Sequence, residues 1–179
     1  MKDGLGRMLM RWRIRMVLPE LRGYLLDIGC GTNDLVKAYQ GKYAGQGQGV
    51  DVFPWDKTVQ VVKDSSELPF DSESVDTITM LASLNHIENR RQVLREAHRV
   101  LRRGGRILIT MIPPGISKLW HRLRAPWDAD QSERGMKEGE VFGFARTQVR
   151  DLLNDSGFRV LFEKRFMLGI NCLTVAEKR

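Results

Sequence analysis

The sequence predicts an α/β domain in which helices cover both faces of a mostly parallel sheet. Three observations support this prediction. Strand-like and helix-like segments alternate from Tyr24 onward, a glycine turn joins the first strand to the first helix, and an acidic residue ends each of the first three strands. With 179 residues and no internal repeat, the chain is predicted to form a single domain over residues 1–179.

The first strand and the first helix are predicted within residues 24–41. Tyr24–Ile28 is a short apolar run that ends at glycines, which is typical of a strand. A helix is expected over Asp34–Gln40, opened by the polar Thr32 or Asn33 and stopped by Gly41. The order of elements is therefore strand, tight turn and helix.

The second and third strands lie unusually close together in the sequence. Gln48–Val52 and Val59–Lys63 are predicted strands, with Asp51 and Asp64 at their ends. Only Phe53–Thr58 separates them, whereas a parallel crossover normally takes about a dozen residues or more. The helix between these two strands is therefore predicted to be shortened or absent.

The middle of the chain predicts a strand, a helix and another strand. Val75–Leu81 has the pattern of a strand, and Asn89 with Gln92 resembles a capping box for the helix that follows. The segment 102–105, Arg-Arg-Gly-Gly, favours the end of that helix, and Arg106–Ile112 is the next predicted strand. The apolar residues that share one face of this helix are Val93, Leu94, Ala97, Val100 and Leu101.

The end of the chain predicts a helix and a hairpin. Thr147 is expected to cap the helix and Gly157 to stop it. Phe158–Lys164 and Ile170–Ala176 are strands with a short loop between them, so they should pair as an antiparallel hairpin. Together the elements predict a Rossmann-like sheet of seven mostly parallel strands, whose ligands bind at the carboxyl ends of the strands.

Charge and cysteine content indicate in which cellular compartment we expect the protein and whether it holds a metal. The formal net charge is +7, and much of the excess lies in a basic N-terminal leader over residues 1–23. Cys30 and Cys172 have neither disulfide-like nor metal-ligand spacing, so we expect a cytoplasmic protein without a metal site. The apolar stretch Met8–Leu18 is interrupted by three arginines, which is untypical of a signal peptide or a membrane span.

The residues at the strand ends form a candidate site for a ligand that contains adenosine. The turn Asp27-Ile28-Gly29-Cys30-Gly31 lets main-chain N–H groups approach a ligand at the start of a helix. Asp51 stands where a carboxylate can accept hydrogen bonds from both hydroxyls of a ribose. Asp64-Ser65 stands within reach of an adenine edge. Acidic residues at three successive strand ends behind a glycine turn form a much stronger signal than any one of them.

With these motifs, the chain resembles the class I S-adenosylmethionine-dependent methyltransferases, in their small-molecule branch of methyltransferase type 11. The resemblance covers roughly residues 24–112 and includes Glu67-Leu68-Pro69-Phe70 before the fourth strand. It implies S-adenosyl-L-methionine as cofactor, with the methionine part near Asp27 and the glycines, and the sulfonium near the backbone of Leu81. The implied cofactor residues are Asp27, Gly29, Cys30, Gly31, Asp51, Val52, Asp64, Ser65 and Leu81.

Two features depart from the pattern of this family. Asn33 stands where the family has the third glycine of its loop, and because Asn tolerates left-handed backbone angles we expect the turn to be kept. The short connection at Phe53–Thr58 removes part of the wall on the adenine side.

Three alternative functions are open at this point. A nicotinamide dinucleotide would require Gly or Ala at position 34, where the carboxylate of Asp34 would face the pyrophosphate. RNA or another nucleic acid as substrate fits the pI near 9.7 and the interleaved Arg11, Trp12 and Arg13, but no Asn/Asp-Pro-Pro-aromatic motif follows the fourth strand. The third is a cofactor-binding protein without transferase activity.

The acceptor is predicted to be a small molecule, a lipid or a sugar, held by the leader and by an insertion over residues 113–146. Within the insertion, Ile116, Leu119, Trp120 and Leu123 share one face of a short basic amphipathic helix. Such a helix can cover an apolar acceptor or make peripheral contact with a membrane. Packing on the domain, with the charges in water, is the competing interpretation.

His86, just past the fourth strand, is the candidate catalytic base. Methyl transfer from a sulfonium is an in-line displacement, so catalysis depends on orientation and on exclusion of water. A base is needed only if the acceptor loses a proton, and a neutral imidazole with a pKa of about 6.5 can accept it. The competing interpretation is that His86 shapes the pocket or caps the turn.

Overall fold

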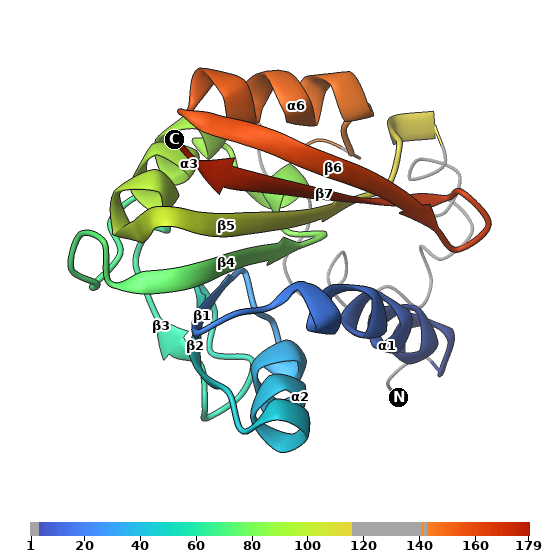
Figure 1. The fold of residues 1–179 in the computed structure, drawn as a ribbon. Helices are drawn as coiled ribbons and strands as arrows, with labels where there is room; N and C mark the ends of the chain where they lie inside the picture. The colour runs from blue at the N-terminus through green and yellow to red at the C-terminus, as the bar shows by residue number, and fades with distance from the viewer. Residues whose placement is uncertain (1–3, 116–140, 142) are drawn as a thin grey trace.

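The sheet has the strand order β3-β2-β1-β4-β5-β7-β6 in the computed structural model, which describes residues 4–115, 141 and 143–179. Strands β1 to β5 are parallel, and β7 lies antiparallel between β5 and β6. The predicted Rossmann-like α/β fold with a C-terminal hairpin is therefore confirmed (Figure 1). The strands are β1 (Tyr24–Ile28), β2 (Gln46–Asp51), β3 (Gln60–Val61), β4 (Val75–Leu81), β5 (Leu101–Met111), β6 (Phe158–Phe166) and β7 (Asn171–Lys178).

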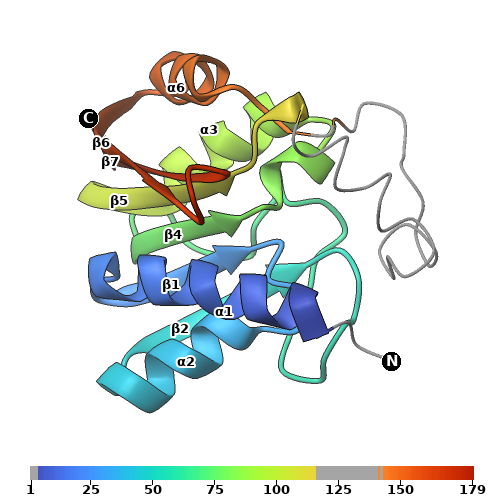
Figure 2. The same cartoon turned by 90° about the vertical axis from the view of Figure 1, so that its right-hand side faces the viewer.

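Helices cover both faces of this sheet. Figures 1 and 2 show α1 (Gly4–Val17) and α2 (Asp34–Tyr43) on one side, and α3 (Arg90–Val100) and α6 (Arg146–Asp155) on the other. Each pair has its own apolar cluster, centred on residues such as Ile14 and Leu35 on the first side and Leu94 and Leu153 on the second. Two short 3-10 helices, η1 (Leu18–Glu20) and η2 (Leu84–His86), precede β1 and follow β4.

The connection between β2 and β3 contains no helix, as predicted. Residues 52–59, all of which the structure describes, form turns and bends only. The third strand is shorter than expected, because only Gln60–Val61 pairs with β2. Strands β1 and β4 begin and end at the predicted residues.

Helix α2 passes through Gly41, so the prediction that this glycine ends the helix is wrong. The helix continues to Tyr43 and ends at Ala44, which adopts a left-handed conformation with φ of 50°. A glycine inside a helix costs only about 1 kcal/mol, and the buried Leu35, Val36 and Tyr39 hold α2 against the sheet. Tertiary packing therefore overrides the local stop signal.

Two predicted helix caps are also corrected. Asn89 precedes α3, but its side chain makes no cap hydrogen bond and is turned toward Asp64, to whose carboxylate its Nδ2 donates. Helix α6 begins two residues earlier than predicted, with Ala145 at the cap position in place of Thr147. Its first turn is closed by Gln148, whose Oε1 accepts a hydrogen bond of 2.8 Å from the N–H of Ala145, so Thr147 is not the cap.

The segment 102–105 forms an irregularity in β5 and not the end of α3. Helix α3 stops at Val100, and Leu101 is already extended and pairs with Val75. The next pair is Thr77 with Arg106, so four residues of β5 stand opposite one of β4. Gly104, with φ of +71°, allows the chain to bulge there.

Some predictions lie beyond what the described residues can address. The amphipathic segment at Ile116, Leu119, Trp120 and Leu123 falls outside them, and the single-domain boundary at 1–179 stays a prediction. Within the described ranges, no helix has the length and apolar character that crossing a membrane requires.

Candidate functional site

The carboxyl ends of β1 and β2 meet at the glycine turn. The N–H groups of Gly29 and Cys30 donate to the carbonyl oxygen of Val50, at 2.9 and 3.2 Å. The N–H of Gly31 donates to Oδ2 of Asp51 at 3.0 Å. Three successive main-chain groups of the turn are therefore held against the end of β2, which brings the predicted glycine and ribose residues together.

The two glycines of the turn are required for different reasons. Gly29 has φ of +71°, and a Cβ there would meet the side chain of Ser83 at 2.5 Å, so close packing on the end of β4 excludes a larger residue. Gly31 has φ of +52°, but a Cβ there would meet nothing within 4 Å. The turn is therefore open to a ligand at Gly31.

Asp27 is the buried carboxyl of the site. Only 3% of its surface is exposed, and its Oδ1 accepts a hydrogen bond of 2.6 Å from the hydroxyl of Thr79 on β4. The pKa of Asp27 is raised to about 7, mainly by burial; the hydrogen bond from Thr79 opposes this rise, and the nearby charge of Asp51 adds to it. Asp27 is therefore a group whose charge can change near neutral pH.

The thiol of Cys30 lies beside the same two acids. It is buried, and its pKa is raised far above its usual value by burial and by the charges of Asp27 and Asp51. The sulfur is thus a neutral thiol that fills space under the turn, and it does not act as a nucleophile.

The carboxylate of Asp51 is held in place by the main chain on both sides. Its Oδ2 accepts from Gly31, and its Oδ1 accepts a hydrogen bond of 3.1 Å from the N–H of Phe53. Val52 is 43% exposed beside it, and the ring of Phe53 contacts that of Trp55 with centroids 4.6 Å apart. An aromatic pair therefore stands in the connection where a crossover helix would normally lie.

Asp64 lies three residues past the end of β3, because that strand is shorter than predicted, and it is also fixed by hydrogen bonds. Its Oδ1 accepts from the N–H of Ser66 at 2.8 Å, and Asn89 Nδ2 lies 2.9 and 3.1 Å from its two oxygens. These bonds, the one from Ser66 above all, lower the pKa of Asp64 despite its partial burial. The Ser65 side chain is buried beside it.

The end of β4 has a strained backbone that the sequence did not indicate. Ala82, directly after Leu81, has φ of 54°, a left-handed angle that is rare for a residue with a Cβ. The conformation is held by a hydrogen bond from Ala82 N–H to Thr110 O at 3.1 Å and by one from Ser83 Oγ to Ile28 O at 2.8 Å. The strained residue sets the direction in which the chain enters η2.

His86 is the last residue of η2 and is half-buried. Its N–H donates to Ser83 O at 2.9 Å, which ties it to the turn after β4. His86 therefore lies in the turn that follows β4, and its place near the reactive end of the cofactor stays a prediction.

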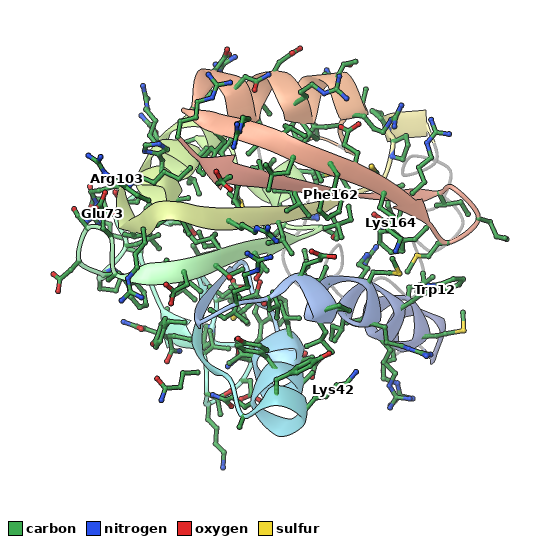
Figure 3. The ribbon with its side chains drawn as sticks, viewed as in Figure 1. Trp12, Lys42, Glu73, Arg103, Phe162 and Lys164 are labelled. Atoms are coloured by element: carbon green, nitrogen blue, oxygen red, sulfur yellow. The ribbon has the colours of Figure 1, made fainter. Side chains whose placement is uncertain are left out.

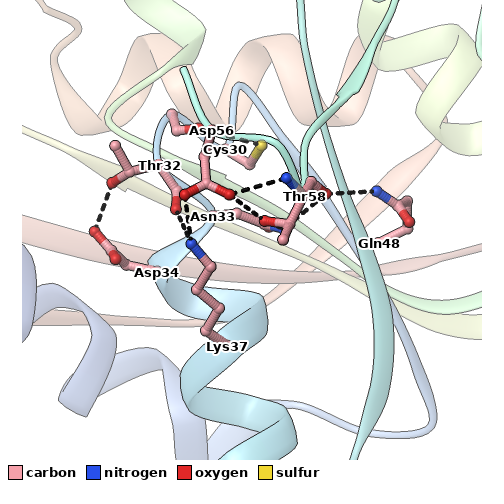
Figure 4. A network of polar contacts seen from close by, with 9 residues as sticks. Cys30, Thr32, Asn33, Asp34, Lys37, Gln48, Asp56 and Thr58 are labelled. Atoms are coloured by element: carbon pink, nitrogen blue, oxygen red, sulfur yellow. Dashed lines mark hydrogen bonds and ion pairs between the residues drawn. The ribbon is translucent and has the colours of Figure 1, made fainter. Parts of the chain in front are cut away.

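A polar network joins the glycine turn to the short β2–β3 connection (Figure 4). Asn33 adopts the expected left-handed conformation, with φ of 62°, and its Nδ2 donates to both the carbonyl and the hydroxyl oxygens of Thr58, at 3.2 and 3.1 Å. Lys37 of α2 bridges Thr32 O and the carboxylate of Asp56, at 3.0 and 2.9 Å. The hydrogen bond from the Thr58 hydroxyl, and after it the bond from Lys37, lower the pKa of Asp56.

Two hollows lie in the helix layers, one on each side of the sheet. One follows α1 and is lined by Arg7, Arg11 and Arg15 together with Met8, Trp12 and Met16. The other lies between α3 and α6, where the guanidinium of Arg90 stands 5.2 Å from the ring centre of Phe144. The first combines basic, aromatic and thioether groups, which suits an apolar molecule with a polar end.

Comparison with known proteins agrees with the fold and the glycine turn. The methyltransferase domain family matches residues 26–109. A demethylmenaquinone methyltransferase of Thermotoga maritima is 24% identical, with 87% of this chain and 80% of the relative covered. A ubiquinone/menaquinone biosynthesis C-methyltransferase of Desulfotalea psychrophila is 26% identical, with 89% and 76% covered. The solved structure of a geranyl diphosphate methyltransferase has the same fold, with a TM-score of 0.72, 16% identity and coverage of 99% and 92%.

The strand order, the glycine turn and these similarities together define a methyltransferase of the Rossmann-like type. The matched domain model and these relatives support a class I S-adenosylmethionine-dependent methyltransferase, with S-adenosylmethionine as its cofactor. The protein is therefore an enzyme that transfers a methyl group.

Proposed function

We propose that the protein methylates a small-molecule acceptor of the quinol class, which is a lipid when it carries a prenyl chain. The observation that carries the acceptor class is the similarity to two curated methyltransferases named for quinone substrates or pathways, each covered over more than three quarters of its length. The hollow along α1 supports it, because Trp12 and three arginines offer an aromatic surface and cations to an electron-rich ring.

The residues at the carboxyl edge fit the cofactor. The turn is open at Gly31, where main-chain N–H groups can approach a carboxylate. Asp51 receives one main-chain bond on each oxygen, so both oxygens keep lone pairs for the two ribose hydroxyls. Asp64 and Ser65 would hold the adenine. When bound, S-adenosylmethionine supplies a methyl group on a positively charged sulfur.

The end of β4 would position the reacting groups. The backbone of Leu81 would lie near the sulfonium, and the strained Ala82 fixes the direction of the following turn. His86 in that turn would either take a proton from the acceptor hydroxyl or shape the pocket by a hydrogen bond. Both roles are compatible with the same position of His86, but they predict a different dependence of the methyl-transfer rate on pH.

Contact with an anionic membrane surface is a second part of the proposal. The arginines at 7, 11 and 15 follow the four-residue spacing of one face of α1, and Met8 and Trp12 are exposed beside them. Leu168, at the tip of the β6–β7 hairpin, is 97% exposed. Met167 of that hairpin packs in the same apolar cluster as Ile14 of α1, so the tip and the helix lie near each other. Basic and apolar groups together are typical of an interfacial surface.

The test is methyl transfer from labelled S-adenosylmethionine to a short-chain 2-prenyl-1,4-naphthoquinol, with purified RNA and a panel of sugars as alternative acceptors. We expect label in the naphthoquinol and no transfer by an Asp51→Ala variant at the same cofactor concentration. Transfer to RNA alone, or to sugars alone, would refute the quinol class. Cofactor binding without transfer to any acceptor would instead favour a binding protein without activity.

A further inference from the structure

Two buried polar side chains, on β5 and β7, have no hydrogen-bond partner among the residues that the structure describes. Thr110 on β5 and Asn171 at the start of β7 both have 0% exposure. Neither the hydroxyl of Thr110 nor either amide atom of Asn171 is bonded to any group within the ranges that the structure describes. Asn171 therefore buries an unpaired donor and an unpaired acceptor on one side chain.

The strand register places these two residues next to the end of β4. Thr110 pairs with Leu81 on one side and with Leu173 on the other, so it lies one strand, about 5 Å, from Leu81. Asn171 lies two residues from Leu173 along β7 and pairs with Phe166 across the hairpin. Because paired and alternate residues share a face, Thr110, Leu173 and Asn171 all face the side of the sheet that α1 covers.

Thr110 and Asn171 lie on the opposite side of β4 in the sheet from the proposed cofactor residues. Asp27 lies in β1, Asp51 ends β2 and Asp64 follows β3, and these three strands lie on one side of β4 in the sheet. Strands β5 and β7 lie on the other side. A ligand that contacts both Leu81 and the ends of β5 and β7 is therefore the acceptor.

A purely structural role does not explain why Thr110 and Asn171 stand at positions where their polar atoms are buried and unpaired. A buried amide or hydroxyl without a partner destabilises the folded state, and an apolar residue of similar size would avoid this cost. Other buried threonines of the same sheet are bonded: Thr77 exchanges two hydrogen bonds with the backbone of Arg22, at 2.7 and 3.1 Å. Thr110 and Asn171 differ from it in having no such partner.

We propose that Asn171, assisted by Thr110, is the polar subsite that orients the acceptor. This inference rests on the proposed function and adds the residues that select the acceptor. The amide of Asn171 offers a donor and an acceptor together, which matches a hydroxyl or carbonyl oxygen on an aromatic ring. The hydroxyl of Thr110 adds a second contact closer to Leu81. The subsite thus fixes which ring atom faces the methyl group.

Access to Asn171 requires a change in the groups that cover it. The hairpin turn next to it contains Met167 and Leu168, with φ of 53° and 56°, and both are left-handed without being glycine. Such strain lowers the cost of moving the turn. The acceptor group would take the place of turn side chains such as Met167, which packs in the cluster that contains Phe166.

The test compares Asn171→Leu and Thr110→Val with Thr77→Val as a matched control, by thermal unfolding of the full chain without acceptor. Thr77→Val removes two hydrogen bonds and should lower Tm by roughly 2–6 °C. Asn171→Leu and Thr110→Val should leave Tm unchanged or raise it. A loss in both of these variants as large as that in Thr77→Val would show that the two polar groups are structural, and would overturn the inference for any acceptor.

A second test measures the KM for the acceptor and the Kd for the cofactor separately. With the prenyl-naphthoquinol as acceptor, Asn171→Leu should raise KM by about tenfold or more while the Kd for S-adenosylmethionine is unchanged. An unchanged KM in an active variant would overturn the subsite. If the wild-type protein does not methylate the naphthoquinol, the quinol class fails, and the stability comparison alone decides the role of Asn171.

Discussion

The raised pKa of Asp27 predicts a stability that decreases as the pH rises through neutrality. Burial shifts its pKa from 3.8 to about 7, so between these values the folded protein binds a proton that the unfolded chain has lost. Because the folded state then binds more protons, the free energy of unfolding decreases with increasing pH in this window. The full difference at high pH is about 4 kcal/mol, from roughly 1.4 kcal/mol for each unit of pKa.

The Asp27→Asn variant removes this dependence and keeps an acceptor for the hydroxyl of Thr79. Relative to that variant, wild-type protein should lose about 2–3 kcal/mol between pH 5 and pH 8, equivalent to a difference in Tm of roughly 5–10 °C. Urea unfolding followed by circular dichroism at four pH values measures it, with the exposed Asp151→Asn as control. A difference between wild type and Asp27→Asn that stays constant with pH would refute the raised pKa.

Three further predictions concern binding and catalysis. Asp51→Ala should weaken binding of S-adenosylmethionine and of its demethylated product by about 1–2 kcal/mol or more in calorimetry, and unchanged affinity in a folded variant would remove Asp51 from the site. If His86 is the base, His86→Ala should lower the rate of methyl transfer by about a hundredfold or more and remove the fall of that rate at acidic pH. A smaller loss, with the pH dependence of the rate unchanged, would show that His86 only shapes the pocket. Leu168→Ser and Arg11→Gln should each reduce co-sedimentation with phosphatidylglycerol vesicles. Arg103→Gln should not reduce it, because Figure 3 shows Arg103 on the opposite side of the molecule from Trp12. An equal loss in the two arginine variants, with no loss in Leu168→Ser, would mean that only net charge matters.

The fold was predictable where local signals and tertiary packing agree. Strands β1 and β4 are bounded by turn residues and are buried on both faces, so their apolar runs marked both ends correctly. The extent of α2 was wrong because a single glycine is a weak stop signal compared with a packed apolar face. The irregularity at 102–105 was missed because two arginines and two glycines suit a helix end as well as a bulge.

The cofactor half of the site was more predictable than the acceptor half. Asp27, Asp51 and Asp64 stand at strand ends in a pattern that sequence alone displays. Asn171 lies in the run Ile170–Ala176, where its neighbours indicate only a buried strand. Its amide is unpaired because of the three-dimensional arrangement of the groups around it, which the sequence does not display. Ala82 carries no sequence signal for a left-handed angle.

The two departures from the family pattern compensate each other. Without a crossover helix, the β2–β3 connection has no packed element to hold it, and the Asn33 that replaces a glycine supplies two hydrogen bonds to Thr58 within it. The same side chain occupies the space above Gly49, where a Cβ would collide with its Oδ1. Restoring glycine at position 33 would therefore remove two of the hydrogen bonds that hold the connection and would leave the ion pair of Lys37 with Asp56. The same connection carries Phe53, whose N–H bonds to Asp51, the proposed ribose residue. Asn33 therefore acts on the proposed cofactor site through the loop that it fixes.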